Sequence, residues 1–412
     1  MNAVGAEAWA ASGVVALTGR PDGPPLVPPG NGAATARALA ERFSDHTSRT
    51  GRAVCVDGPR LLSERAALLG LRRRGGVSAG GACRLLPTAD GWAAVSCARP
   101  DDPALLAALA GTEVGDDPWP ALGAWLREHT GADLTERARL LGVAAGAVAR
   151  RRSPAPLPEP LEPCTLEGAL VVDFSALWAG PLCAHLLGLA GARVVKVETP
   201  ARPDGARYGH PGFYRLLHAG HRSVVLDPGA PAGRRALSAL VDAADIVIEA
   251  SRPRALARFG LDAGAAVAAG TTWVSITAHG RDDDGIGFGD DVAAAAGLVC
   301  HERDGAPLFC GDALADPLTG LTAAVLASTA PPGGGGMLWD VAMSDVVAAT
   351  LGTGDPDIPS PAATRDGDGW AVDTADGPVP VALPAVRRAA GPAAAMGEHT
   401  REVLRELGIA AP

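Results

Sequence analysis

The stretch from Ala169 to Pro200, ALVVDFSALWAGPLCAHLLGLAGARVVKVETP, decides the fold of this chain. It opens on a short apolar run over residues 169–173 that ends in an acid, which predicts a buried parallel strand. A turn of small residues at 178–181 leads into helix-compatible sequence over 182–190. The run 193–198 then predicts a second strand. Two parallel strands joined through a helix form a βαβ unit, whose crossover is right-handed.

The same alternation continues toward the C-terminus. Apolar runs at 223–227, 245–249 and 273–277 predict three more strands, each separated from the next by helix-compatible sequence. This pattern is typical of an α/β fold with a doubly wound, Rossmann-like parallel sheet. Ligands of such sheets bind beyond the carboxyl ends of the strands. We therefore expect a site near residues 173–181 and 198–207.

The first part of the chain is less regular. Two β-like runs at 83–87 and 92–97 flank an Asp-Gly turn and predict a hairpin, and a strand is expected at 52–56 and a helix at 61–71. Further helices are predicted at 103–110, 119–129 and 134–141, whereas 352–376 is expected to be loop. At 412 residues two domains are the default. A basic, proline-rich connector favours a smaller α+β domain at 1–150, a linker at 151–165 and the Rossmann-like domain at 166–412.

Net charge, apolar runs and cysteine content limit the partners and the cellular location that can be expected. The net charge of -10 argues against a nucleic-acid partner, and no apolar run is long enough to span a bilayer. The N-terminus lacks the basic start of a secretory signal. Seven cysteines without a CxxC pair suit a reducing compartment. We therefore expect a cytoplasmic protein that contacts neither nucleic acid nor membrane.

Familiar cofactor motifs are missing from the sequence. The turn after Asp173 has one glycine followed by a proline, where a nicotinamide site needs GxGxxG. GxxxxGK[ST] and GxSxG are both absent, which excludes a P-loop and weighs against a serine hydrolase. The histidines show no ligand spacing, so no metal is expected.

Carboxylate chemistry remains. The loop from Gly311 to Gly320 sets Asp312 and Asp316 just before an apolar helix. A carboxylate at this place can be a helix N-cap. Alternatively, it can be a nucleophile that forms acyl-aspartate intermediates, with backbone N–H groups stabilising the oxyanion.

Several blocks of the second half occur together in one family. They are Leu166-Glu167-Gly168 with VVDFSALWAGP, LAGARVVKVETP, Asp204 with Arg207, HRSVVLD at 221–227, 244–261, GDDVAAAAGL at 289–298, ADPLTG at 315–320, 339–345 and the terminal GEHTREVLRELG. In this order they resemble the family III CoA-transferases, the CaiB/BaiF group that includes formyl-CoA transferase and α-methylacyl-CoA racemase.

The resemblance implies a CoA-transferase that moves CoA from an acyl-CoA to a carboxylic acid. Asp316 would be the catalytic residue that forms an aspartyl anhydride and an aspartyl-CoA thioester, with Asp312 as the alternative. Coenzyme A and acyl-CoA would be substrates, and no further cofactor is implied. The positions that match the family's CoA contacts are Leu177, Trp178, Ala179, Gly180 and Arg207. Arg207 could instead form a surface salt bridge. The family's interlocked rings imply a homodimer.

Some positions depart from the family. Phe288, Gly289 and Asp290 stand where the racemase branch has its histidine, and Trp178 replaces a common glutamine. Two alternatives therefore stay open: a catalytically reduced CoA-thioester-binding paralogue, and an acyl-CoA racemase or isomerase of the same fold.

The order of the segments also differs. The Ala89–Trp92 hairpin resembles one that follows the catalytic loop in the family, and we expect no second copy after Ser344. Residues 1–150 are thus interpreted as the family's small domain moved forward, or as the remnant of a fused copy.

Overall fold

The predicted parallel sheet is confirmed. The computed structural model describes residues 3–113, 115, 117–149, 156–251, 253–351 and 359–412. Its main sheet has six parallel strands in the order β13-β9-β8-β5-β6-β7. Their bounds are β5 (Leu170–Asp173), β6 (Arg193–Glu198), β7 (Arg222–Val225), β8 (Ile246–Glu249), β9 (Thr272–Thr277) and β13 (Met337–Ala342). Chain order reverses between β5 and β8, so the crevice at their carboxyl ends is the expected ligand position.

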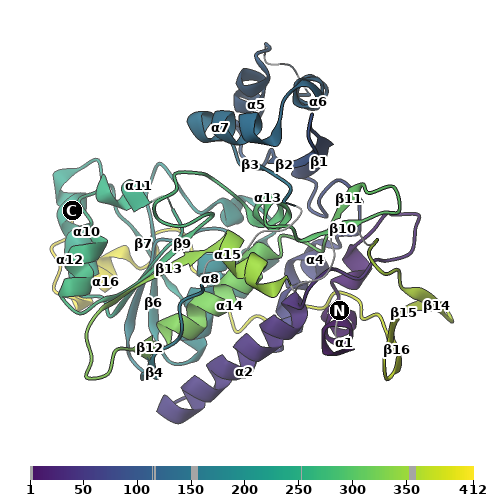
Figure 1. Ribbon diagram of the computed structural model, residues 1–412. Helices are drawn as coiled ribbons and strands as arrows, with labels where there is room; N and C mark the ends of the chain where they lie inside the picture. Colours follow the sequence, from purple (N-terminus) through teal and green to yellow (C-terminus); the bar gives the residue numbers. More distant parts are fainter. Residues whose placement is uncertain (1–2, 114, 116, 150–155, 252, 352–358) are drawn as a thin grey trace.

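Helices cover both faces of the sheet, as Figure 1 shows. One face carries α2 (Gly32–Thr50), α8 (Ala179–Leu189) and α14 (Ala315–Ala327), and the other carries α10 (Pro231–Asp242), α12 (Ala263–Ala268) and α16 (Thr400–Glu406). Side chains alternate between the faces along each strand. Val171 and Ile248 therefore join the core beneath α8 and α14, whereas Val172 and Val247 join the opposite core.

A small α+β module lies at the top of Figure 1, and its sheet packs on Ala294, Val299 and Phe309 of the main body. It contains β1 (Cys83–Pro87), β2 (Trp92–Ser96), β3 (Ala145–Ala147), α5 (Asp102–Ala110), α6 (Trp119–Glu128) and α7 (Gly131–Leu141). β1 and β2 pair antiparallel around the Asp-Gly turn, as predicted. The N-terminal helices do not belong to this module. Trp9 and Phe43 lie in the main core, and the helix that carries Phe43 packs against α14.

The remaining elements connect these parts. They are α1 (Ala3–Ser12), α3 (Gly58–Leu61), α4 (Glu64–Leu69), β4 (Glu162–Pro163), α9 (Pro211–His218), α11 (Pro253–Ala257), α13 (Gly289–Ala295), β10 (Val299–His301), β11 (Pro307–Phe309), β12 (Thr329–Ala330), α15 (Met343–Thr350), β14 (Thr364–Asp366), β15 (Gly369–Thr374) and β16 (Gly377–Pro380). Of the predicted linker, residues 151–155 lie outside the described residues, and the domain boundaries stay a prediction.

Three local predictions were wrong. Residues 52–56 form no strand, because the Val54 amide donates to the Thr47 hydroxyl and no partner strand lies alongside. The helix expected at 61–71 is broken at residues 62–63 into α3 and α4. The loop expected at 352–376 contains the three-stranded sheet β14-β15-β16, and its residues 352–358 lie outside the described part.

The sheet β14-β15-β16 also corrects the expectation that no second hairpin follows Ser344. β14 and β15 pair antiparallel, with Asp366 opposite Gly369 and Arg365 opposite Trp370. Strands this short need only a few residues, so the C-terminal region has room for them.

Candidate active site

Asp316 is placed by the packing of two helices. α14 is buried on nearly all sides. At Gly320 it comes so close to α8 that a Cβ atom would lie 2.7 Å from the Ala179 carbonyl oxygen. Residues four apart share one face of a helix. Asp316 therefore lies one turn before this contact, beside the start of α8.

Asp316 faces a cavity of about 500 Å³. The cavity is lined by residues that end or follow five of the six strands, among them Leu177 after β5, Arg202 after β6, Ser251 after β8, Thr277 at the end of β9 and Met343 after β13. It thus lies at the carboxyl edge of the sheet, where ligands of this fold class bind. Asp316 as a residue is half-buried, and it lines this cavity.

The structure separates the residues predicted to contact CoA. Leu177 and Ala179 line the cavity with Asp316. Trp178 is buried, with its ring edge-on to Phe213 at 5.3 Å between centroids. Gly180 is also buried, and a Cβ there would lie 2.1 Å from the Ser175 Cβ. Gly180 thus allows the start of α8 to pack on the loop after β5.

Arg207 is outside the cavity lining. Its Nε donates to Glu198 Oε1 at 2.8 Å, and its terminal nitrogen lies 2.5 Å from Oε2. The guanidinium also lies 4.4 Å from the ring centroid of Tyr214. Arg207 therefore forms a two-point salt bridge in this structure, on a partner at the end of β6.

Asp316 belongs to a cluster of four aspartates, and it is the only one of the four that lines the cavity. Burial raises the pKa of Asp316 to about 7, and the charges of Asp290 and Asp312 act in the same direction. Burial also raises the pKa of Asp290 to about 6 and that of Asp291 to about 7. Opposing these effects, Arg65 and the backbone N–H of Ala179 favour the ionised form of Asp316.

Residues from the N-terminal region support this cluster, although no motif in the sequence marks them. Arg65 on α4 binds Asp312 through two nitrogens, with Nε 2.9 Å from Oδ2. The Ser96 hydroxyl donates to Asp291 at 2.6 Å, and the Thr18 hydroxyl accepts from the Gly311 amide at 3.0 Å. No local pattern marks a lone arginine or hydroxyl as part of a site. Only a contact between distant segments would have identified them.

The backbone is strained just before each of the two helices that meet at Asp316. Among the described residues other than glycine, Leu177 (φ 69°) and Ala313 (φ 48°) have positive φ. Leu177 precedes α8, and Ala313 precedes α14. Such conformations cost about 1–3 kcal/mol and are retained where surrounding contacts enforce them.

Replacing Ala313 by glycine should therefore leave the free energy of unfolding unchanged or raise it by up to about 1.5 kcal/mol. Relief of the left-handed conformation gains about 1–2 kcal/mol, and the extra freedom of glycine in the unfolded chain costs about 0.5–1 kcal/mol. Urea unfolding measures the difference. The control Ala323→Gly, inside α14, should lose about 1 kcal/mol. Equal losses in both variants would contradict strain at Ala313.

The buried carboxyls should make stability fall as the pH rises. Each has a folded pKa above its unfolded value of about 3.9, so between about pH 4 and pH 7 the folded state holds more protons than the unfolded state. Asp291→Asn should remove on the order of 2 kcal/mol of the fall between about pH 5 and pH 8. Urea unfolding at both pH values tests this, with the exposed Asp282→Asn as control. Identical pH dependence in Asp291→Asn and the wild type would contradict it.

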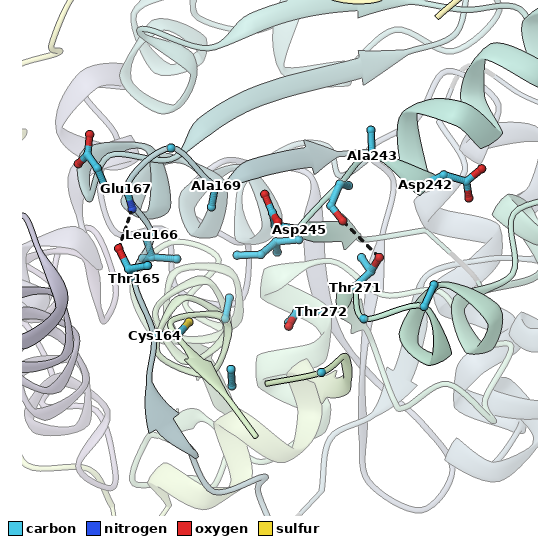
Figure 2. A pocket seen from close by; sticks show the side chains of 18 residues that line it. Cys164, Thr165, Leu166, Glu167, Ala169, Asp242, Ala243, Asp245, Thr271 and Thr272 are labelled. Carbon is cyan, nitrogen blue, oxygen red and sulfur yellow. Dashed lines mark hydrogen bonds between the residues drawn. The ribbon is translucent and has the colours of Figure 1, made fainter. Parts of the chain in front are cut away.

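A second cavity, of about 610 Å³, lies at the opposite edge of the sheet. Figure 2 shows its side chains, among them Glu167 before β5, Asp245 before β8 and Thr271 before β9. It contains none of the residues predicted for the site. Because it borders the amino ends of the strands, it is not the expected position of the active site.

The described residues contain neither a helix that could span a membrane nor a cluster that could bind a metal. No described helix combines the length and apolar character needed to cross a bilayer. No group of three or more histidine, cysteine, aspartate or glutamate residues in the described part could hold a metal ion.

Comparison with known proteins identifies the second half of the chain. Residues 166–375 match the model of CoA-transferase family III. A succinate–glutarate CoA-transferase of Agrobacterium fabrum is 32% identical over 210 residues, which cover 45% of this chain and 52% of that enzyme. A formyl-CoA:oxalate CoA-transferase of Afipia carboxidovorans is 31% identical over 209 residues, which cover 44% and 47%. The chain thus spans about half the length of these relatives.

A crystal structure of a CaiB/BaiF family protein from Brucella suis aligns with a TM-score of 0.45 and 24% identity, over 53% of this chain and 65% of that one. The family model covers more than half of the chain, and its range includes the cavity-lining loops after β5, β6, β8 and β9 as well as Asp316. The chain therefore belongs to CoA-transferase family III.

Proposed function

We propose that this chain is a CoA-transferase that moves CoA from an acyl-CoA thioester to a carboxylic acid, with Asp316 as the nucleophile. The observation that carries the proposal is the position of Asp316. Its carboxyl group faces the cavity at the carboxyl edge of the sheet, in the first turn of α14 and beside the first residue of α8. Family membership supports the same chemistry.

The proposed reaction has two halves. A carboxylate oxygen of Asp316 attacks the thioester carbonyl, the carbon–sulfur bond breaks, and CoA leaves as thiolate with a mixed anhydride on the enzyme. The thiolate then attacks the aspartyl carbonyl and releases the donor acid, which leaves an aspartyl-CoA thioester. The acceptor carboxylate attacks this thioester and forms a second anhydride. The returning thiolate attacks the acceptor carbonyl and frees Asp316.

The helix ends supply the electrostatic environment for these steps. The first N–H groups of a helix have no partner within the helix, and they carry partial positive charge. Asp316 lies at the start of α14, and the N–H of Ala179 at the start of α8 favours its ionised form. Fixed N–H groups of this kind stabilise the negative oxygen that develops in acyl transfer.

Arginines on the cavity wall fit a phosphorylated ligand. Arg202, Arg254 and Arg258 line the cavity, and the 40% exposed side chain of Leu177 adds an apolar surface. Guanidinium groups bind phosphate oxygens in pairs. Because Arg207 is paired with Glu198 and Arg254 is paired with Asp284, we assign the phosphates of CoA to Arg202 and Arg258.

The other functions weighed above have less support. The described residues that line the cavity include no histidine, so nothing there favours the racemase. A reduced CoA-binding paralogue would bind acyl-CoA without acylating Asp316. The homodimer stays a prediction, which sedimentation of the purified protein would test, and so does the cytoplasmic location.

Trapping the acyl-enzyme tests the proposal. The protein is mixed with succinyl-CoA and labelled succinate, and with a panel of other acyl-CoAs and their acids, and exchange of label is followed. Hydroxylamine is then added, and peptides are examined by mass spectrometry for a hydroxamate at Asp316. Exchange together with this hydroxamate supports the proposal. Binding of acyl-CoA with neither exchange nor hydroxamate across the panel would indicate the reduced paralogue instead.

A further inference from the structure

Arg65 reaches the site from a part of the chain that lies outside the family match. It lies on α4, outside the residues that match the family, and family membership therefore assigns it no role. Its Nε lies 2.9 Å from Asp312 Oδ2 and its terminal nitrogen lies 2.5 Å from Oδ1, which is the two-point geometry that only arginine provides. The partner Asp312 is 0% exposed, whereas Arg65 keeps 26% of its side-chain surface.

The ion pair holds the loop that leads into α14. Asp312 is only four residues before Asp316. The neighbouring Ala313 amide donates to Asp290 Oδ1 at 2.8 Å, and the Gly311 amide donates to the Thr18 hydroxyl. Arg65 thus contributes one of three anchors for a loop whose residue Ala313 is held at a positive φ. Loss of the anchor should loosen the position of Asp316.

Arg65 also balances the local charge. Asp316 is surrounded by Asp290 on α13 and Asp312 on its own loop, whose charges disfavour its ionised form, and Arg65 is the cation that acts in the opposite sense. Behind the guanidinium lies the Trp178 ring, with its centroid 5.3 Å from Arg65 Cζ. A cation over an aromatic face is stabilised there. This contact also links α4 to the start of α8.

We propose that Arg65 is a positioning residue of the transfer site, supplied by the N-terminal region of the same chain. Its guanidinium holds the Asp312 loop and offsets the charges of Asp290 and Asp312, so that Asp316 meets the thioester as a carboxylate. This inference rests on the proposed function for its catalytic consequence. Its electrostatic part concerns the ionisation of Asp316, which exists with or without a substrate.

The test measures the ionisation of Asp316 directly. The carboxyl carbon of Asp316 is followed by NMR in aspartate-labelled protein, and its resonance is assigned by its loss in Asp316→Asn. Removing the cation in Arg65→Gln should raise the titration midpoint by about one pH unit or more, because an opposite charge at this range favours the ionised form by about that amount. Removing the neighbouring anion in Asp312→Asn should lower the midpoint. Arg65→Lys should restore most of the wild-type value.

Exchange kinetics give the second readout, with succinyl-CoA or whichever acyl-CoA of the panel acylates the wild type. In Arg65→Gln the acidic limb of the kcat profile should move up with the NMR midpoint. At pH values below the limb, kcat should fall about tenfold for each pH unit by which the midpoint rises. Arg65→Lys should recover the limb but only part of kcat, because an ammonium lacks the two-point fork. Arg60→Gln, on the adjacent α3, is the matched control.

The proposal would be overturned if the titration midpoint of Asp316 in Arg65→Gln equalled the midpoint in the wild type and in the control Arg60→Gln. A folding defect in Arg65→Gln leaves Asp312→Asn and Arg65→Lys as independent measurements of the same charges. If the wild type transfers no CoA and the midpoints still move as expected, the proposed function fails while the role of Arg65 in the ionisation of Asp316 stands.

Discussion

Asp316→Asn should lower the rate of CoA exchange by roughly 10,000-fold or more, the loss expected when a covalent nucleophile is removed. Asparagine fills the same space but offers no anionic oxygen, so the first anhydride cannot form. The exchange assay with labelled succinate measures this loss, and the hydroxamate at residue 316 should disappear with it. Binding of acyl-CoA should persist, because the cavity walls are unchanged.

The same variant should be at least as stable as the wild type above about pH 7. Burial raises the pKa of Asp316, so ionisation at high pH destabilises the folded state, and the uncharged amide avoids this cost. Inactivity together with retained stability excludes misfolding. The comparison variant Asp312→Asn should lose much less activity. An active Asp316→Asn beside an inactive Asp312→Asn would move the nucleophile to Asp312, the alternative left open by the sequence.

Gly289→Ala should have the second largest effect. A Cβ on Gly289 would lie 2.2 Å from Asp316 Oδ2 and 2.6 Å from the Ala313 carbonyl oxygen. One methyl group would therefore displace both the proposed nucleophile Asp316 and the backbone that precedes α14. A misplacement of about 1 Å at a reacting group costs on the order of 100-fold in rate. We expect kcat for exchange to fall by at least that factor, with a loss of about 1–3 kcal/mol in stability from overpacking.

Gly76→Ala is the matched control, because a Cβ at Gly76 meets nothing within 4 Å. It should leave both exchange and unfolding close to the wild type. The loss of exchange in Gly289→Ala requires an intact nucleophile to displace, so the double variant Gly289→Ala with Asp316→Asn should be no less active than Asp316→Asn alone. Full exchange activity in Gly289→Ala would show that this region of α13 does not abut the working nucleophile.

Local chemistry accounts for the parts of the fold that were predicted correctly. The bounds of β6 match the apolar run 193–198, and β9 lies within one residue of its expected range. Runs of this kind are buried on both faces of a parallel sheet. Each strand can therefore be predicted from its own residues, without knowing which strands lie beside it. α8 began at Ala179, ahead of the expected residue 182, because a proline is tolerated in the first turn of a helix.

Features that depend on partners were missed. The strands β14 and β16 are mostly exposed and carry glycine, proline and charge, so their sequence resembles loop until the hairpin brings them together. Residues 52–56 have strand-like composition but no strand to pair with. Arg207 was a fair candidate for phosphate binding by residue type. Only the structure shows that its guanidinium forms a salt bridge with Glu198.

The sequence by itself determined the doubly wound sheet, the loop that carries Asp316 and the resemblance to family III, because each is written in contiguous residues. The tertiary structure decided that Leu177 and Ala179 face the cavity while Trp178 and Gly180 do not. It also brought Arg65 to Asp312 across 247 positions of the chain. The balance of charge around Asp316 is a sum over side chains from α4, α13 and α14, and no single stretch of sequence contains that sum.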